Sequence, residues 1–194
     1  MGVSAGAFRT TIAFDDVDID LEQASVSAIL GYQISDRVGL VATAGVILGG
    51  SVEHVSGISG DVGSGFVTSL SATYIPVYET ESRPFLLGTF TLGVSRTTAE
   101  SDNGISEDWT AADARLGIMV GKTFAERFVP FVAARVFGGP VNWRLAGQDV
   151  IGSDIHHYTV GAGASYRIPG KLSIFAEALP LGEQSLNVGA SVPF

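Results

Sequence analysis

A short segment around residue 155 carries residue types that acid–base catalysis uses. Asp154, His156 and His157 lie close together there, and a His–Asp pair can activate a water molecule or a serine hydroxyl. Tyr158 and Thr159 follow directly, so the segment has no His-x-Ser arrangement. Adjacent histidines are more typical of residues that support a loop. We therefore predict that the chain is not an enzyme, with a rim-located lipid or peptide hydrolase as the weakest alternative.

Several charged residues stand inside runs of apolar and small residues, where an unpaired charge would be costly. They are Arg9, Asp113, Arg115, Arg135 and Glu177. We expect these side chains to form an ion-pair network that closes an interior. The alternative is a gate or a narrow polar path, which would make the protein a small channel for ions or small solutes.

Two dense groups of carboxylates offer oxygen ligands of the kind that Ca²⁺ and Mg²⁺ prefer. The first group lacks the glycine and the ligand spacing of an EF-hand, so solvated loop tips are the simpler interpretation. A divalent cation stays a candidate ligand of the first group only, and no cofactor is predicted. The groups are Asp15, Asp16, Asp18 and Asp20 with Glu22, and Glu100, Asp102, Glu107 and Asp108.

Composition excludes several classes of protein. There are no cysteines, so neither a disulfide scaffold nor a thiolate metal site can form. The formal net charge of −9 argues against nucleic acid as a partner, because such a partner requires a basic surface. Mean hydropathy is +0.34, yet no apolar run approaches the ~18 residues of a membrane-spanning helix. Hydrophobicity without a helix-length segment is typical of a membrane β-barrel, in which apolar and polar residues alternate.

The elements that would position these residues are β-strands. Short polar turns recur every ~45 residues, and each interval holds two strand-like runs joined by a longer loop. Short turns on one rim and longer loops on the other are typical of outer-membrane barrels. We predict an all-β fold, a transmembrane antiparallel up-and-down β-barrel of ten strands (eight the alternative), in one domain over 1–194. The strands are expected near 3–14, 21–34, 38–53, 65–78, 84–98, 109–124, 128–144, 154–168, 172–180 and 185–194, with longer loops near 15–20, 55–64, 99–108 and 146–153.

Residue types alternate along these strands with a period of two, which defines two faces. Over 38–48 the even positions are Val, Leu or Ala, while glycine and threonine occur at odd positions. The mid-strand charges all have odd numbers, and a charge on a lipid-facing surface costs roughly 2–4 kcal/mol. We therefore predict that even-numbered residues face lipid throughout. Bulky odd-numbered residues near the short turns are expected to fill and close the interior at that end of the barrel. They are Ile29, Val41, Ile75, Phe85, Leu87, Phe131 and Phe175.

Aromatic residues with even numbers gather near the short turns. Amphipathic rings prefer the level of lipid headgroups, so these residues predict an interfacial girdle. Trp109 and Trp143, near the longer loops, are predicted to cap the interior or to anchor loops. Gly138–Pro140 is expected to break the seventh strand, because proline cannot donate to a β-ladder. The girdle residues are Tyr32, Tyr74, Tyr78, Phe124, Tyr166 and Phe194.

The alternating strands, the Gly31–Arg37 hairpin, the Ala176–Gln184 stretch and the terminal Phe194 together resemble a known superfamily. It is that of small Gram-negative outer-membrane β-barrels, which includes opacity-type adhesins and OmpA-like transmembrane domains. Eight strands are common in it, so the ten expected here depart from its pattern. The resemblance implies a location in the cell outer membrane, with long loops extracellular and termini periplasmic.

The last strand-like run also resembles the C-terminal signal that the barrel assembly machinery reads. The matching residues are Asn187, Gly189, Val192 and Phe194. The superfamily hosts many functions, and for this chain we predict a structural or surface-interaction role. The expected partners are outer-membrane lipid, lipopolysaccharide, the assembly machinery during insertion, and other barrels or a larger envelope assembly.

Overall fold

The computed structural model describes residues 1–14, 17–54, 59–101, 106–145, 148–169 and 172–192. Every regular element within them is a β-strand, so the all-β prediction is confirmed. No helix in this part of the chain is long and apolar enough to cross a membrane. The strands are β1 (Gly2–Phe14), β2 (Val17–Gln33), β3 (Val38–His54), β4 (Ser59–Val62), β5 (Gly65–Val77), β6 (Phe85–Ser101), β7 (Ser106–Gly121), β8 (Phe128–Gly138), β9 (Val141–Leu145), β10 (Gln148–Asp154), β11 (Tyr158–Ile168), β12 (Leu172–Gly182) and β13 (Gln184–Ser191).

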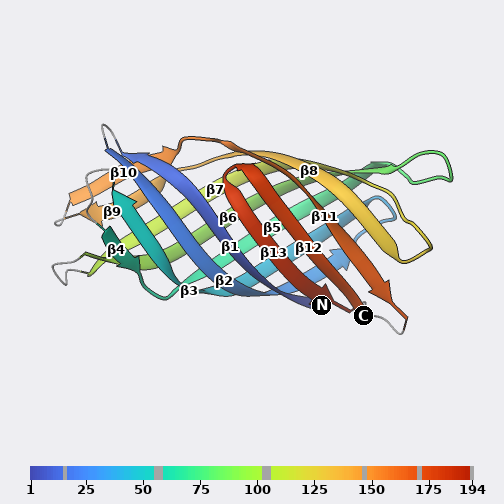
Figure 1. Cartoon of the computed structure of the whole chain (residues 1–194), viewed down its shortest axis with the longest axis horizontal. Helices are drawn as coiled ribbons and strands as arrows, with labels where there is room; N and C mark the ends of the chain where they lie inside the picture. The colour runs from blue at the N-terminus through green and yellow to red at the C-terminus, as the bar shows by residue number, and fades with distance from the viewer. Residues whose placement is uncertain (15–16, 55–58, 102–105, 146–147, 170–171, 193–194) are drawn as a thin grey trace.

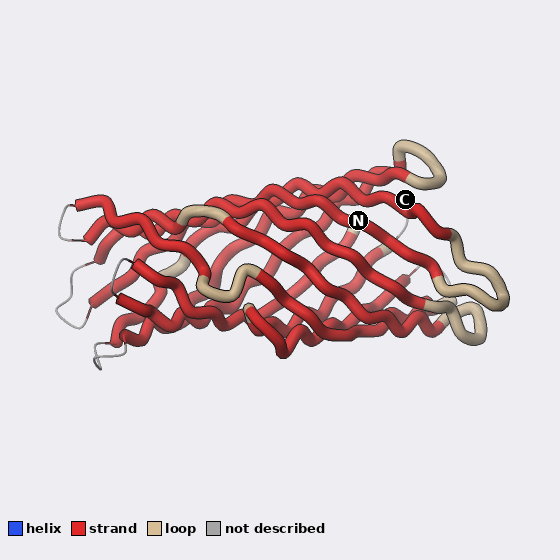
Figure 2. The backbone as a smooth tube through the Cα atoms, turned by 90° about the horizontal axis from the view of Figure 1, so that it is seen from above, coloured by secondary structure: helices blue, strands red, loops and turns tan. Residues whose placement is uncertain are grey.

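The strands pair into one antiparallel sheet that closes into an elongated barrel (Figures 1 and 2). From β1 the ladders run through β2, β3, β5, β6, β7, β8, β11, β12 and β13, which pairs with β1 again, a ring of about ten strands. Closure gives partners to backbone groups that a free edge would leave unpaired. The short connections after β2, β5 and β7 lie at one end of the barrel, called the turn end below, near both chain termini (Figure 1).

The ring narrows toward the opposite end. The β12–β13 hairpin turns at Glu183, short of that end, and Gly182 adopts the positive φ of 80° that the turn requires. Beyond the hairpin β10 takes its place and pairs directly with β1, at Ile12↔Asp154. This part of the barrel, called the narrow end below, is at the left of Figure 1. Its ring consists of β1, β2, β3, β4, β6, β7, β9 and β10.

Strands extend into segments that the sequence predicted as loops. β4 and most of β10 lie within the loops expected near 55–64 and 146–153. The seventh expected strand is divided, because β8 ends at Gly138 and β9 begins at Val141. That division confirms the predicted break at the glycine–proline step.

Inner and outer faces alternate along each strand, but the numbering of the faces differs from the prediction. Odd-numbered residues face inward on most strands, whereas the even-numbered residues do so on β1, β4 and β10 and on β3 beyond Gly49. The buried even-numbered residues there include Ile12, Phe14, Val52, Val62 and Asp154. The reason is register, because β1 pairs with β2 residues of opposite parity, as in Phe14↔Val17, and paired residues share a face. The prediction that even numbers face outward throughout is therefore wrong.

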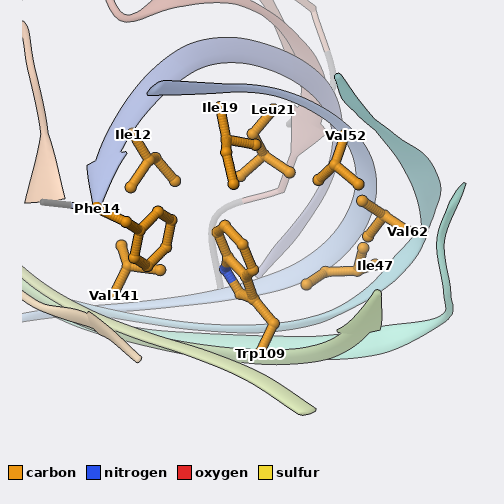
Figure 3. Close-up of a cluster of buried hydrophobic side chains, with 9 residues drawn as sticks. All are labelled: Ile12, Phe14, Ile19, Leu21, Ile47, Val52, Val62, Trp109 and Val141. Carbon is orange, nitrogen blue, oxygen red and sulfur yellow. The ribbon is translucent and has the colours of Figure 1, made fainter. Parts of the chain in front are cut away.

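Buried apolar side chains fill the interior of the narrow end (Figure 3). They come from β1, β2, β3, β4, β7 and β9 and point toward one another across the ring. Trp109 projects into the middle of the group and is 2% exposed. This group, called the apolar cluster below, consists of Ile12, Phe14, Ile19, Leu21, Ile47, Val52, Val62, Trp109 and Val141.

Candidate functional site

The middle of the barrel holds a charged network centred on Arg115 of β7. Its Nε donates to Asp113 Oδ2 at 2.7 Å, and its two terminal nitrogens donate to the two carboxylate oxygens of Glu183 at 2.6 and 3.1 Å. The guanidinium carbon also lies 4.5 Å from the centre of the Phe137 ring. A bidentate pair of this kind is among the stronger polar contacts in proteins. It ties β7 across the interior to the tip of the β12–β13 hairpin.

A second ion pair joins β8 to β12. Arg135 donates to Glu177 Oε2 at 2.6 Å, and Glu177 is 8% exposed. The structure thus places Asp113, Arg115, Arg135 and Glu177 on the inner face, each with a partner of opposite charge. Paired charges in the interior avoid the cost of a lone buried charge. A cavity of about 320 Å³ lies against this network and the apolar cluster.

Arg9 does not belong to this network, and its predicted place in the interior is wrong. It faces outward on β1 and pairs with Asp20 at 3.2 Å and Glu22 at 3.4 Å. Thr11 donates its hydroxyl to the other oxygen of Asp20 at 2.5 Å. The hydrogen bond from Thr11, followed by the contacts with Arg9, lowers the pKa of Asp20 below its ordinary value. The odd number of Arg9 misled the prediction because β1 has the opposite parity to β2.

Four residues of the acidic groups, Asp18, Asp20, Glu22 and Asp108, lie on the outside of the narrow end. Asp18 is exposed, and Asp20 is engaged by Thr11 and Arg9. Asp108 pairs with Arg96 at 2.9 Å. Within the described residues no group of His, Cys, Asp and Glu could hold a metal ion. Asp15, Asp16 and Asp102 lie outside the described residues.

Three aromatic rings stack inside the narrow end. The Trp109 ring centre lies 5.6 Å from that of Phe14 and 5.4 Å from that of Trp143, and the Phe14 and Trp143 centres are 5.8 Å apart. Edge-to-face and tilted contacts at these separations are favourable. Both tryptophans thus lie in the interior that they were predicted to cap, packed with the aliphatic residues of the apolar cluster.

The turn end is hollow, whereas the sequence predicted that bulky side chains would fill and close it. A cavity of about 940 Å³ lies at this end and is lined by Ile29, Val41 and Ile75. The phenylalanines that were predicted to fill this end, Phe85, Phe131 and Phe175, lie against the barrel wall. Their rings occupy the space over glycines of neighbouring strands. A Cβ atom at Gly189, for example, would lie 2.5 Å from the Phe175 ring. The prediction that these residues fill the turn end is therefore wrong.

Aromatic side chains ring the outside near the turn end. The predicted girdle residues that the structure describes are all exposed, and their exposed fractions range from 39% for Tyr78 to 67% for Tyr32. The guanidinium of Arg37 lies 5.0 Å from the centre of the Tyr78 ring. They are Tyr32, Tyr74, Tyr78, Phe124 and Tyr166, while Phe194 lies outside the described residues.

The final strand closes the barrel on β1. Asn187 and Gly189 face inward on β13, where Gly189 accommodates the Phe175 ring. Val192 is outward, and its backbone exchanges hydrogen bonds of 2.8 Å with Met1. These contacts give part of the assembly-signal motif a packing role in the seam. They leave its recognition by other proteins a prediction.

The His–Asp segment is arranged as a structural turn. Asp154 faces inward and accepts hydrogen bonds from the Thr10 hydroxyl and from the His156 backbone N–H, the latter at 2.7 Å. The His156 ring contacts the Tyr158 ring edge-on, with centres 6.3 Å apart, and His157 has a positive φ of 53°. Within the described residues, the Asp154 carboxylate thus contacts the Thr10 hydroxyl and the His156 backbone amide. They brace the β10–β11 connection against β1.

Sequence reasoning missed Glu183 and the apolar cluster. Glu183 stands in a turn, where a carboxylate is ordinarily solvated, and only the depth of the hairpin brings it to Arg115. The cluster had a readable signal in β2, where Ile19 and Leu21 alternate with Asp18, Asp20 and Glu22. That alternation is a strand with an apolar face, placed where a loop was expected.

Comparisons with known proteins support the fold. No protein-family model and no curated protein matches the sequence. The translocator domain of the autotransporter NalP from Neisseria meningitidis superposes with a TM-score of 0.57 at 12% identity, over 100% of this chain and 88% of that one. The outer membrane protease OmpT from Escherichia coli gives 0.52 at 10% identity, over 97% and 93% of the two chains. At these identities the likeness concerns the fold, a β-barrel of the outer-membrane kind.

Proposed function

We propose that this chain is an integral outer-membrane barrel with a structural or surface-interaction role and a closed interior. Its outer surface supports membrane insertion. On β2 the outward residues from Ala24 to Tyr32 are Ala, Val, Leu and Tyr, and that length matches the ~9–11 residues of a membrane-spanning strand. Beyond it the outward positions carry Glu22 and Asp20. The narrow end therefore projects into water.

The observation that carries the closed interior is the apolar cluster. A narrow apolar constriction excludes water, and the narrow end holds Trp109 and its aliphatic neighbours. The Arg115–Glu183 and Arg135–Glu177 pairs span the interior below it. Two successive barriers favour a closed barrel over the small channel that the mid-strand charges also allow.

Planar-bilayer recording tests the closed interior. The reconstituted protein should show no steady single-channel steps, and neither should the Leu116→Ala control, which changes an exposed outward residue of β7. Steady steps in the unaltered protein that Glu177→Ala abolishes or enlarges, while Leu116→Ala leaves them unchanged, would establish a channel in place of the closed barrel.

The location and orientation are tested by labelling single cysteines, since the chain has none of its own. Glu53→Cys places a thiol on the outside of the narrow end, and Ser82→Cys places one in a turn at the opposite end; both positions are exposed. With the narrow end extracellular and the termini periplasmic, a membrane-impermeant maleimide should label Glu53→Cys on intact cells. Ser82→Cys should react only after the outer membrane is permeabilised. The reverse pattern would invert the orientation, and equal labelling without permeabilisation would contradict insertion.

The partners in this proposal follow from location and charge. Outer-membrane lipid surrounds the apolar belt, and the carboxylates outside the narrow end could share divalent cations with lipopolysaccharide. The assembly machinery would read the last strand, including Asn187, Gly189 and Val192. No enzymatic step forms part of the proposal.

A further inference from the structure

The cavity at the turn end has the composition of a binding site. Its volume of about 940 Å³ is within the range of small-molecule pockets. Ile29, Val41 and Ile75 give it an aliphatic wall, and Thr73 adds a hydroxyl. The charged side chains that line it are Arg37 and Arg167, and no carboxylate lines it among the described residues. This local excess of positive charge occurs in a chain whose net charge is −9.

Both guanidinium groups are available for an anion. Arg37 lies over the Tyr78 ring, a contact that leaves its N–H donors free to bind elsewhere. Neither Arg37 nor Arg167 forms an ion pair within the described residues. No carboxylate oxygen there lies within 4.0 Å of their guanidinium nitrogens. Arg167 contributes weakly to lowering the pKa of Glu79, whose hydrogen bonds are with Thr123. Guanidinium groups suit carboxylate and phosphate, which they can bind through paired N–H donors.

The cavity is open at the turn end and blocked further in. Along β12 the inward residues run from Ser173, which lines the cavity, to Phe175, Glu177 and Leu179. Beyond Phe175, Glu177 is paired with Arg135 across the interior, and Leu179 is 2% exposed. A molecule that enters from the turn end would therefore be held in the cavity. It would not pass through the barrel.

We propose that this cavity binds a single-chain amphipathic anion, with its aliphatic body against Ile29, Val41 and Ile75 and its carboxylate or phosphate at Arg37 and Arg167. A free fatty acid and a lipid that has lost one acyl chain share this chemistry. The site deepens the proposed function, because a barrel closed beyond the cavity would retain such a ligand. Binding at the cavity and conductance through the barrel are separate measurements, so either can fail alone.

The test is calorimetric titration of the full chain in zwitterionic lipid nanodiscs, with empty nanodiscs subtracted. Dodecanoate represents a free fatty acid and a twelve-carbon lysophosphatidic acid represents the lipid source. Dodecanol supplies the chain without the anion, and acetate supplies the anion without the chain. We expect saturable binding of one or both amphipathic anions and none of dodecanol or acetate. Dodecanol binding as tightly as dodecanoate, or no saturable binding of either amphipathic anion, would overturn the proposal.

Matched variants locate the site. The double variant Arg37→Gln/Arg167→Gln should weaken binding roughly tenfold or more, since it removes charge-assisted hydrogen bonds. The control Arg83→Gln/Arg127→Gln removes two arginines from the same end of the barrel outside the cavity lining and should bind as the unaltered chain does. Val41→Trp keeps both arginines but fills the aliphatic part, and it should also abolish binding. Equal binding by all variants, each shown to be folded by its heat-modifiable electrophoretic mobility, would exclude the cavity as the site.

Discussion

One continuous sheet forms both the narrow end and the rest of the barrel. The polar and apolar faces of the sheet are exchanged between these two regions. Toward the turn end the inner face carries hydroxyls and ion pairs, such as the Ser71–Thr91 hydrogen bond of 2.7 Å, and the outer face carries exposed Leu70, Leu116 and Ile118. In the narrow end the inner face is the apolar cluster and the outer face carries charge. In the proposed function this difference corresponds to different surroundings, lipid for one region and water for the other.

Strand β2 shows the change within a single element. Its inward residues change from Ser27 and Ser25 to Leu21 and Ile19, while its outward residues change from aliphatic to acidic. The strand stays regular through the change, because side-chain alternation is independent of which face is apolar. In the proposed function, the position where both faces change together is the boundary between membrane and water.

The largest expected effect tests the core of the narrow end. Trp109→Ala removes a side chain that is 2% exposed and should cost about 3–5 kcal/mol in the free energy of unfolding, the usual cost of such a cavity. The control Leu116→Ala truncates an outward residue on the same strand and should cost less. Urea unfolding in lipid vesicles, followed by electrophoretic mobility, measures both. Equal costs would show that the narrow end lacks a core of its own.

A matched pair of isoleucines tests the boundary between the two regions. Ile118 and Ile151 are outward residues that are 58% and 68% exposed, but Ile118 is in the proposed membrane belt and Ile151 is in the narrow end. Ile118→Arg should cost roughly 2–4 kcal/mol of stability in lipid, whereas Ile151→Arg should be near neutral because its side chain meets water. The same urea titration decides this. Similar losses for both variants would place the narrow end inside the membrane.

The smallest expected effect concerns charge on the water-facing surface. The pKa of Asp20 is lowered in the folded protein, first by the Thr11 hydroxyl and then by Arg9. Its carboxylate therefore adds stability above the ordinary value of 3.8, and this contribution is lost as the pH falls through the lowered pKa. Asp20→Asn should destabilise the protein at neutral pH by less than about 1 kcal/mol, since the pair is half exposed.

Comparison of the two proteins across pH checks the sign of this effect. The difference in unfolding free energy should shrink as the solution is acidified below pH 3.8, where the folded carboxylate takes up its proton. Thr11→Val should remove most of the same pH dependence. A difference that grows on acidification would contradict the assigned contacts.

Most of the barrel could be predicted from local patterns. Alternation along each run defined the strands, and the glycine–proline step at 138–140 placed the division between β8 and β9. The inward side of Arg115, Arg135 and Glu177 followed from the small residues around them. Arg9 could not be placed in the same way, because its side depends on how β1 pairs with β2 and β13.

The sequence by itself determined a closed antiparallel sheet, since a period of two with one apolar face requires burial or lipid on that face. Tertiary structure alone decided the register of β1, the early turn of the β12–β13 hairpin and the replacement of that hairpin by β10 in the narrow end. These decide that Glu183 meets Arg115 and that Trp109 meets Phe14. The physical reason is that backbone ladders pair strands without regard to side-chain type. Which residues meet across the barrel is therefore set by contacts far apart in the chain.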